Sequence, residues 1–474
     1  MMTQETFLSE VSDLVAVDLK KDQIHALEEV YRFLFHGGSQ SIFILRGYAG
    51  TGKTTLIGAL IRWFHSVNRK TVLMAPTGRS AKVLASHSGY PASTIHRRIY
   101  SFKEIESGKP FMELARNTTE KTMFFVDEAS MIGETNQEEG LRARSLLEDL
   151  ISYVNGGERC RLILIGDDAQ LPPVGMDLSP ALDRKKLASI SHSAIFQAQL
   201  IEVVRQARDS MILSNATLIR NQINEGAFDA LKLMVSAEQD MFIIDPYDLE
   251  DRLSQLFSGD KAHESVIICR SNKDANQFNQ QVRSRILYRE AKIEGGDRLM
   301  IVKNNYKQNL PGNRQNFLAN GDMITVDRVH AFHRFKPFEF AEVEVHFSDE
   351  PEQTFDLIVL LNSLEFEGPS IPGKELFKMR AAMIEAGQID PNEPEEKFFQ
   401  NPFFNSVQVK YAYAVTCHKS QGGQWSNVFI FQGYFTDEMM DRSYFRWLYT
   451  AVTRATDKLM LINFPPSLIV EGLN

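Results

Sequence analysis

Residues 47–55 carry the pattern G-x-x-x-x-G-K-[ST], which is typical of a loop that binds nucleotide phosphates. Glycines let backbone N–H groups turn toward an anion, and the amino end of a following helix adds partial positive charge. In this pattern Lys53 is the partner of the β- and γ-phosphates, and the Thr54 hydroxyl is a ligand of Mg²⁺. A chance match in a chain of this length has a probability of roughly 2%. The pattern therefore predicts a site for a nucleoside triphosphate.

Two acidic stretches follow further along the chain. Asp127 and Glu128 come directly after the apolar run 123–126. In a triphosphatase one such carboxylate helps to hold Mg²⁺, and the next orients and deprotonates the attacking water. The alternative is a pair of solvated turn acids, which the phosphate loop upstream makes the weaker interpretation. In the stretch 166–174, Gln170 is a neutral donor and acceptor that could sense the γ-phosphate.

The elements that must position these residues form an α/β pattern. Apolar runs at 41–45, 71–75, 123–126 and 161–165 predict buried strands, and the helix expected over 56–64 follows the glycine loop. Each strand runs into a polar loop, and loops after parallel strands are where such sheets bind ligands. The sequence therefore predicts a first lobe with a parallel sheet and the phosphate site at its carboxyl edge.

A second α/β unit is predicted from about residue 265. Its expected strands are 266–269, 409–415, 428–431 and 459–462, and Ser271 can cap the first helix. Residues 292–404 interrupt this unit. Their short alternating strands and the turn at Asn320-Gly321-Asp322 predict a small β-barrel, followed by a charged, partly helical segment. The polar stretch 97–121 is either a projecting hairpin or a plain surface loop.

The net charge and the cysteine content of the chain limit the classes of protein to which it can belong. The 474 residues carry a formal net charge of −9, which argues against a chain that coats nucleic acid by bulk charge but allows a local basic groove. The cysteines, Cys160, Cys269 and Cys417, are far apart and predict neither a metal site nor a disulfide framework. A reducing, cytoplasmic location is expected, with no signal peptide and no membrane-spanning run.

Together these stretches resemble the motifs of a superfamily 1 DNA helicase, most closely the RecD-like and Dda-like branch of superfamily 1B with 5′-to-3′ polarity. The resemblance covers nearly the whole chain. Motif I matches residues 47–55, motif Ia matches 75–81, the Thr-Ile-His signature matches 94–96 and motif II matches 127–131. Motif III matches 166–174, motif IV matches Arg205, motif V matches 416–422 and motif VI matches 449–455. The resemblance implies two RecA-like lobes. Lobe 1 is expected over residues 1–96 and 122–205, and lobe 2 over residues 206–291 and 405–474. Residues 97–121 are expected to form a strand-separating pin, and residues 292–404 an SH3-like insertion.

The resemblance also implies roles for single residues. Arg454 would act as an arginine finger from lobe 2, and Thr54 with Asp127 would hold Mg²⁺. Gln23, by itself a solvated helix residue, would lie at the adenine. The implied catalytic residues are Lys53, Glu128, Gln170, Arg205 and Arg454. The implied ATP contacts are Gln23, Gly422 and, in the loop, Gly47, Ala49, Gly50, Thr51, Gly52, Lys53, Thr54 and Thr55. The implied DNA contacts are Pro76, Thr77, His96, Thr416 and His418.

The expected function is that of an ATP-dependent DNA helicase that uses ATP and Mg²⁺ on single-stranded DNA and at single-strand/duplex junctions, with replication or repair proteins as possible partners. Phe111, beside the turn at 108–110, is the candidate for stacking on the first base pair. One alternative is an ATPase that translocates without separating strands. The other is a nucleotide-dependent binding or scaffold protein without useful turnover.

Overall fold

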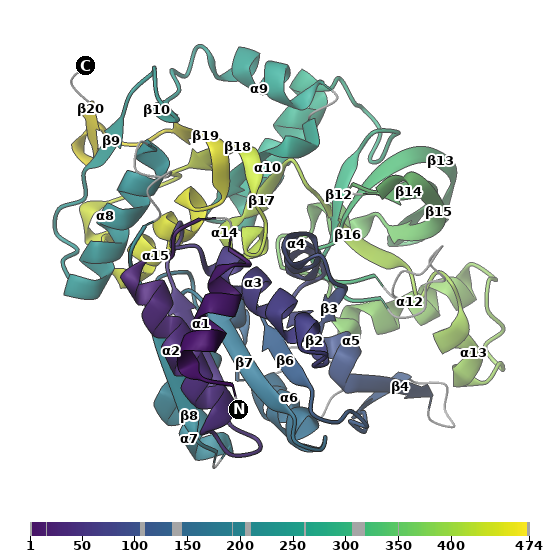
Figure 1. Cartoon of the computed structure of the whole chain (residues 1–474). Coiled ribbons are helices and arrows are strands. Elements are labelled where there is room, and N and C mark those ends of the chain that lie inside the picture. Colours follow the sequence, from purple (N-terminus) through teal and green to yellow (C-terminus); the bar gives the residue numbers. More distant parts are fainter. Residues whose placement is uncertain are drawn as a thin grey trace.

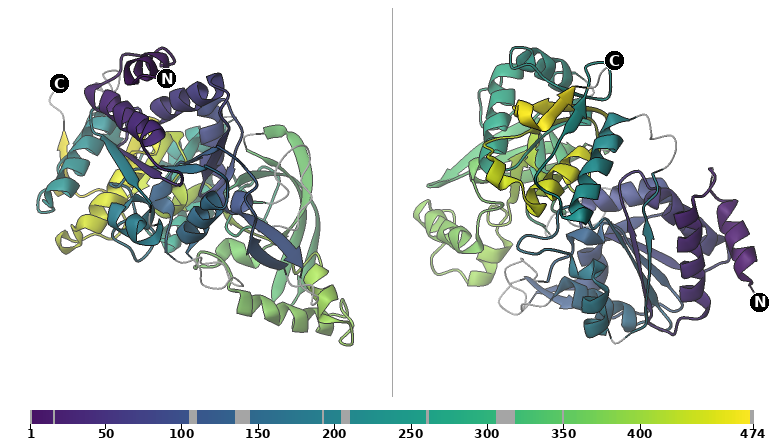
Figure 2. Two further views of the ribbon diagram at one scale, coloured as in Figure 1. Left: turned by 60° about the horizontal axis from the view of Figure 1, so that its bottom comes forward. Right: turned by 90° about the vertical axis from the view of Figure 1, so that its left-hand side faces the viewer.

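The computed structural model describes residues 2–15, 17–104, 110–134, 145–191, 193–203, 210–259, 262–305, 318–348 and 350–471. Two α/β lobes lie against each other, and a β-barrel lies beside the second lobe (Figure 1). Two further views show the hairpin that projects from lobe 1 and the helices at the far end of the barrel (Figure 2). No helix in the described part of the chain is long and apolar enough to span a membrane.

Lobe 1 is built on a parallel six-stranded sheet in the order β3-β2-β6-β7-β1-β8. Its strands are β1 (Ile42–Gly47), β2 (Thr71–Ala75), β3 (Ala92–Thr94), β6 (Met123–Val126), β7 (Arg161–Gly166) and β8 (Ile195–Leu200). Phe43 and Leu45 pack on one face and Ile42 and Ile44 on the other, because side chains alternate along a strand. Both faces are therefore covered, which explains the nearly continuous apolar runs in the sequence.

Helices cover the two faces of this sheet. One face packs against α1 (Gln4–Ser12), α2 (Lys21–Phe35), α3 (Lys53–Ser66) and α4 (Gly78–Ser88). The other packs against α5 (Ile95–Ile99), α6 (Leu146–Asn155) and α7 (Arg184–Ser191). After α5 the chain forms the antiparallel hairpin of β4 (Tyr100–Glu104) and β5 (Pro110–Leu114). Of the two interpretations of 97–121, the hairpin is therefore the one present. Phe111 pairs through its backbone with Lys103 in this hairpin, and its side chain is outside the described part of the structure.

Lobe 2 has a parallel five-stranded sheet in the order β10-β19-β18-β11-β17. The strands are β10 (Met241–Ile243), β11 (Ser265–Cys269), β17 (Ala414–Thr416), β18 (Trp425–Phe431) and β19 (Ala455–Ile462). The helices of this lobe are α8 (Met211–Glu225), α9 (Leu249–Phe257), α10 (Asn272–Gln281), α14 (Cys417–Ser420) and α15 (Arg442–Val452), and β9 (Leu233–Val235) pairs with β20 (Ile469–Glu471). The sheet repeats the parallel architecture of lobe 1.

A closed barrel interrupts lobe 2. It consists of β12 (Arg298–Ile301), β13 (Met323–Phe335), β14 (Phe338–Phe347), β15 (Glu350–Leu360) and β16 (Val407–Tyr411). Between β15 and β16 the chain forms α11 (Asn362–Glu365), α12 (Gly373–Glu385) and α13 (Glu395–Gln400). The prediction of one strand over 409–415 is wrong, because β16 belongs to the barrel and β17 to lobe 2. Asn279 explains the break: its side-chain Oδ1 accepts the backbone N–H groups of Tyr413 and Ala414 and holds the chain where it changes sheets.

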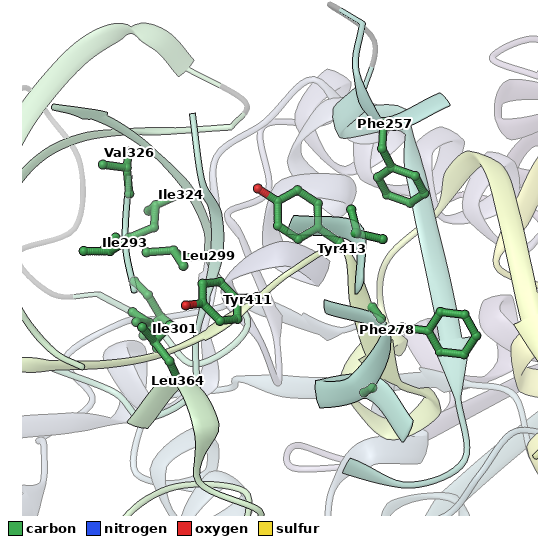
Figure 3. Packing of buried hydrophobic residues seen from close by; sticks show 14 of the residues in the cluster. Phe257, Phe278, Ile293, Leu299, Ile301, Ile324, Val326, Leu364, Tyr411 and Tyr413 are labelled. Atoms are coloured by element: carbon green, nitrogen blue, oxygen red, sulfur yellow. The ribbon is translucent and has the colours of Figure 1, made fainter. Parts of the chain in front are cut away.

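The barrel and lobe 2 share one hydrophobic core. Phe257 and Phe278 of lobe 2 belong to the same buried cluster as Ile324 and Val326 of the barrel, and Tyr413 lies between the two groups (Figure 3). A buried carboxylate reinforces this junction. Asp297 accepts hydrogen bonds from Arg283 Nε at 2.9 Å, Arg289 Nη1 at 2.7 Å and the Tyr413 hydroxyl at 3.1 Å. Because its charge is paired and hydrogen-bonded on several sides, Asp297 is compensated in the low-dielectric interior.

A candidate nucleotide site between the lobes

The phosphate loop connects β1 to α3 and requires glycine at several positions. Gly50 and Gly52 have φ angles of 73° and 78°, a left-handed conformation that glycine adopts without strain. A Cβ at Gly47 would lie 2.7 Å from Cγ of Lys53. Gly52 is the N-cap of α3 and provides no side-chain cap. The amino end of α3 therefore keeps its backbone donors available for an anion.

Lys53 lies folded against its own loop. Its ammonium group donates to the backbone carbonyls of Gly47 and Tyr48, the latter at 2.8 Å, and lies 3.8 Å from Oδ2 of Asp167. These partners keep the cation at the carboxyl edge of the sheet, between the loop after β1 and the loop after β7. Within the described ranges, the carboxylates that interact with this cation belong to Asp127, Glu128 and Asp167 of neighbouring loops.

Asp127 and Glu128 follow β6 at the same edge. Glu128 has a φ of 52°, an uncommon conformation for a residue with a side chain, and such strain often marks functional sites. Both residues are half-buried, and burial raises the pKa of both carboxyl groups. Lys53 opposes the shift at both, and Arg454 opposes it at Glu128. The two acids predicted from the sequence are thus close to both predicted cations.

Lobe 2 contacts this edge through a tyrosine of α15. The Tyr449 hydroxyl donates to Oδ2 of Asp167 and accepts the backbone N–H of Ala49, both at 2.8 Å. Asp167 is 1% exposed, and burial raises its pKa to about 6. Sequence reasoning did not single out Tyr449, although it lies in the segment 449–455 that matched a family motif. Its bond to the phosphate loop depends on tertiary structure that no local pattern reveals.

Further bonds close the interface between the lobes. The backbone N–H of Leu171 donates to Thr450 Oγ1 at 2.8 Å, and Gln421 Nε2 donates to the Leu171 carbonyl at 2.7 Å. Gly422 has a φ of 72°, and a Cβ there would lie 2.8 Å from Cβ of Ser80 at the start of α4. Gly422 thus lies where the loop after β17 contacts lobe 1.

Gln170 and Arg454 differ in how their polar groups are satisfied. Gln170 is 6% exposed, and its Oε1 has no hydrogen-bond partner among the described residues. A buried acceptor without a partner requires an explanation, and a nucleotide bound at the phosphate loop would provide one. Arg454 is 4% exposed and donates to the carbonyls of Thr450 and Gly423 and to Thr453 Oγ1. Arg205 lies outside the residues that the structure describes.

Gln23 is not the solvated residue that its local sequence suggests. It is 4% exposed, its Nε2 donates to the Thr51 carbonyl at 2.9 Å, and its Oε1 accepts the Lys20 backbone N–H at 2.8 Å. The local interpretation failed because the partner lies 28 residues away in the phosphate loop. Gln23 therefore connects α2 to that loop.

The predicted DNA contacts lie in the loops after β2 and β17 and on α5. Thr77, which follows Pro76, caps α4 through its hydroxyl, and Thr416 is the N-cap of α14. The barrel turn at residues 319–322 reaches the same region, because a Cβ at Gly321 would lie 3.7 Å from Cβ of Thr77. His418 is exposed. His96 lies on α5, where its ring centroid is 5.7 Å from that of Tyr100.

Comparisons with known proteins identify two family domains. An AAA domain matches residues 18–237, and a UvrD-like helicase C-terminal domain matches residues 411–462. The chain is 30% identical over 200 residues to the ATP-dependent RecD2 DNA helicase of Deinococcus radiodurans, a match that covers 42% of this chain and 24% of that protein. It is 26% identical over 260 residues to the ATP-dependent DNA helicase dda of Enterobacteria phage T4, covering 51% and 52%. These matches thus span about a quarter and about half of the two helicases.

Longer but weaker similarities also occur. An uncharacterized protein, R530 of Acanthamoeba polyphaga mimivirus, is 21% identical over 89% of this chain and 95% of its own length. Among solved structures, that of a Pif1 helicase from Bacteroides in complex with ADP-AlF3 and ssDNA aligns with a TM-score of 0.49 and 16% identity, over 96% of this chain and 95% of that one.

Proposed function

Because the chain belongs to the superfamily 1B helicases, with RecD-like and Dda-like relatives, we propose that it is an ATP-dependent DNA helicase that moves 5′-to-3′ along single-stranded DNA and separates duplex DNA. The observation that carries the proposal is the contact of Tyr449 with the phosphate loop. It joins α15 of lobe 2 to Ala49 at the place where a nucleotide would bind. A change at that place is therefore transmitted directly to the position of lobe 2.

The described residues fit a nucleotide with its Mg²⁺. The uncapped amino end of α3 and Lys53 would hold the phosphates, and Thr54 with Asp127 would hold the metal. No group of three or more His, Cys, Asp or Glu residues in the described ranges is arranged to hold a metal alone. That suits Mg²⁺, which proteins commonly bind with one or two carboxylates together with the substrate phosphates. When bound, ATP would supply the phosphoanhydride whose hydrolysis drives movement, and Mg²⁺ would offset the negative charge of its phosphates.

The residues around the phosphate loop have different proposed roles in ATP hydrolysis. Glu128 acts as general base, since its carboxylate can accept a proton from the attacking water and its raised pKa favours that uptake. Gln170 orients the water through its unpaired Oε1. Arg454, whose charge already acts on Glu128, stabilises the negative charge that develops during transfer. Arg205 is proposed to assist it, and Gln23 to contact the adenine.

Movement follows from the contacts between the lobes. The bonds from Tyr449, Thr450 and Gln421 to lobe 1 all lie beside the phosphate site, so their making and breaking shifts one lobe against the other. The strand would bind at the loops after β2 and β17 and at α5, through Pro76, Thr77, His96, Thr416 and His418. Contacts to the sugar-phosphate backbone suit a motor that cannot depend on base identity. Phe111 in the hairpin is proposed to stack at the duplex junction.

The decisive experiment measures ATP hydrolysis with and without single-stranded DNA, and unwinding of duplexes that carry either a 5′ or a 3′ single-stranded tail. We expect DNA to stimulate hydrolysis and only the 5′-tailed duplex to be unwound. Stimulated hydrolysis without unwinding of either substrate would identify a translocase that does not separate strands. No stimulated hydrolysis would instead favour a nucleotide-dependent binding protein.

A further inference from the structure

A cavity lies at the β3 edge of the lobe 1 sheet, away from β1 and the phosphate loop that follows it. Its volume is about 530 Å³. It is bounded by β2 and the edge strand β3, and residues from the end of α3, from the loop after α4 and from α5 complete its wall. The hairpin of β4 and β5 starts at Tyr100, immediately after α5. The cavity therefore lies at the base of the element that projects from lobe 1.

Two arginines give this cavity a positive charge. Arg97 and Arg98 both line it, and among the residues that the structure describes no aspartate or glutamate does. Arg97 Nη1 and Arg98 Nε are buried and have no hydrogen-bond partner among the residues that the structure describes. Guanidinium groups are usually paired when they are removed from water. Two adjacent arginines that lack such partners can bind an anion with planar oxygens, of which phosphate is the best match.

An aromatic pair forms another part of the wall. The rings of His65 and Tyr90 are stacked, with centroids 3.8 Å apart and planes 4° from parallel. A hydrogen bond of 2.9 Å between His65 Nε2 and Thr71 Oγ1 fixes the histidine ring. Both side chains are partly exposed. A flat aromatic surface beside cationic groups is the combination that binds unpaired nucleotides, because bases stack on the ring while phosphates meet the charge.

We propose that this edge cavity binds the second DNA strand, the one that is displaced at the junction, through its phosphates at Arg97 and Arg98 and a base at Tyr90. The inference rests on the proposed strand separation, since only a protein that works at a junction meets a second strand. The position supports it. Arg97 and Arg98 follow His96, the proposed contact of the tracking strand, on the same short helix, and the hairpin follows them directly. Residues 96–100 thus lie where two separating strands would diverge.

The test compares two DNA substrates in the absence of ATP. Both are duplexes with the same 5′ single-stranded tail, and only one, the fork, also carries a 3′ tail on the other strand. We expect the parent protein to bind the fork more tightly, and the double variant Arg97→Gln/Arg98→Gln to lose about tenfold of that preference. The dependence of fork binding on log salt should also become shallower by about 1.4, as expected for two lost contacts to a single strand. Equal fork preference in parent and variant would overturn the proposal.

Two further variants make the outcome specific. Tyr90→Leu keeps the charges and should reduce fork preference by about fivefold without changing the salt dependence, because it removes only stacking. Arg184→Gln is the matched control, since this exposed arginine lies on α7 beside the opposite edge strand, β8. It should behave like the parent. A double variant that also loses binding to the 5′-tailed duplex has lost its fold, and Tyr90→Leu then decides the question.

The experiments distinguish an error in the proposed strand site from an error in the proposed helicase activity. If the parent shows no DNA-stimulated hydrolysis but its fork preference depends on Arg97 and Arg98, the proposed strand site is supported and the proposed helicase activity is refuted. If the parent unwinds DNA but its fork preference is the same with and without Arg97 and Arg98, the proposed helicase activity is supported and the proposed strand site is refuted. If millimolar inorganic phosphate abolishes the fork preference of the parent but leaves binding of the 5′-tailed duplex unchanged, the cavity is a small-molecule pocket, and the assignment to a strand is overturned.

Discussion

The two lobes share a parallel α/β architecture but differ at one helix terminus. In lobe 1, β1 leads through the glycine loop to α3, whose N-cap Gly52 provides no side-chain cap. In lobe 2, β11 leads within two residues to α10, whose N-cap Ser271 accepts the backbone N–H of Asp274 at 3.0 Å and donates to the Asp274 carboxylate at 2.6 Å. The amino end of α10 thus has its cap and its negative charge from its own sequence.

This difference shows how similar folds acquire different roles. A helix terminus attracts an anion wherever it is placed, because its first N–H groups lack partners. Lobe 2 meets that need internally with Ser271 and Asp274, whereas lobe 1 leaves it open and adds Lys53. The nucleotide site is therefore expected in one lobe only, with Tyr449 and Arg454 as the proposed contribution of lobe 2.

The largest effect is expected from the lysine of the open helix terminus. Lys53→Ala should abolish ATP turnover, because the phosphates lose their ammonium partner. Lys273→Ala is the matched variant, since Lys273 is exposed in the first turn of α10. It should leave turnover unchanged in the same steady-state assay with single-stranded DNA. A comparable loss in both variants would show that the two helix termini are not functionally different.

Arg454 tests the contribution of lobe 2. Arg454→Ala should reduce turnover by roughly 10³-fold or more while ATP affinity changes little, as for arginine fingers in related enzymes. Arg454→Lys keeps the charge but not the planar arrangement of donors, and should restore only part of the rate. Because Arg454 also donates to Thr450 and Gly423, melting temperatures must be compared. Full turnover in Arg454→Ala would exclude the finger role.

Asp167 should make stability depend on pH. Its pKa is about 6 in the folded chain and about 4 when unfolded, so its contribution to stability is fully present below about pH 4 and is lost as the pH rises through about 6. Relative to Asp167→Asn, the parent should therefore lose on the order of 2 to 3 kcal/mol of unfolding free energy between pH 4 and pH 7. Urea unfolding of both proteins across this range measures the difference. A constant difference would contradict the raised pKa.

The smallest effect is expected at the internal cap. Ser271→Ala should lower the free energy of unfolding by about 1 kcal/mol, because the Asp274 N–H loses its acceptor. ATP turnover per folded molecule should stay the same, since the nucleotide is expected at α3 and not at α10. Changed turnover at unchanged stability would show instead that this terminus takes part in the reaction.

The sequence predicts most strongly what local patterns determine. The glycine loop, the acids after β6 and the parallel sheets all follow from short stretches in which residue type fixes conformation or burial. The barrel was predicted as an insertion for the same reason, since alternating apolar residues such as Val343 and Val345 form strands with one buried face.

What the sequence does not predict depends on contacts between distant segments. The end of the barrel was missed because Asn279, far along the chain, redirects Tyr413 and Ala414. The local sequence around Gln23 predicts a solvated residue, because the partner that buries it, Thr51, lies in the distant phosphate loop. The edge cavity has no motif at all, since its wall comes from four or more elements that only the folded lobe brings together.

The core shared by the barrel and lobe 2 restricts how this chain can be shortened. An inserted domain with its own core can usually be excised and its ends rejoined, and here the entering and leaving strands β12 and β16 are even paired side by side. Excision would nevertheless open the apolar cluster of lobe 2, and would leave Arg283 without Asp297. For protein engineering, lobe 2 and the barrel are one folding unit, and a minimal version of this protein must retain both.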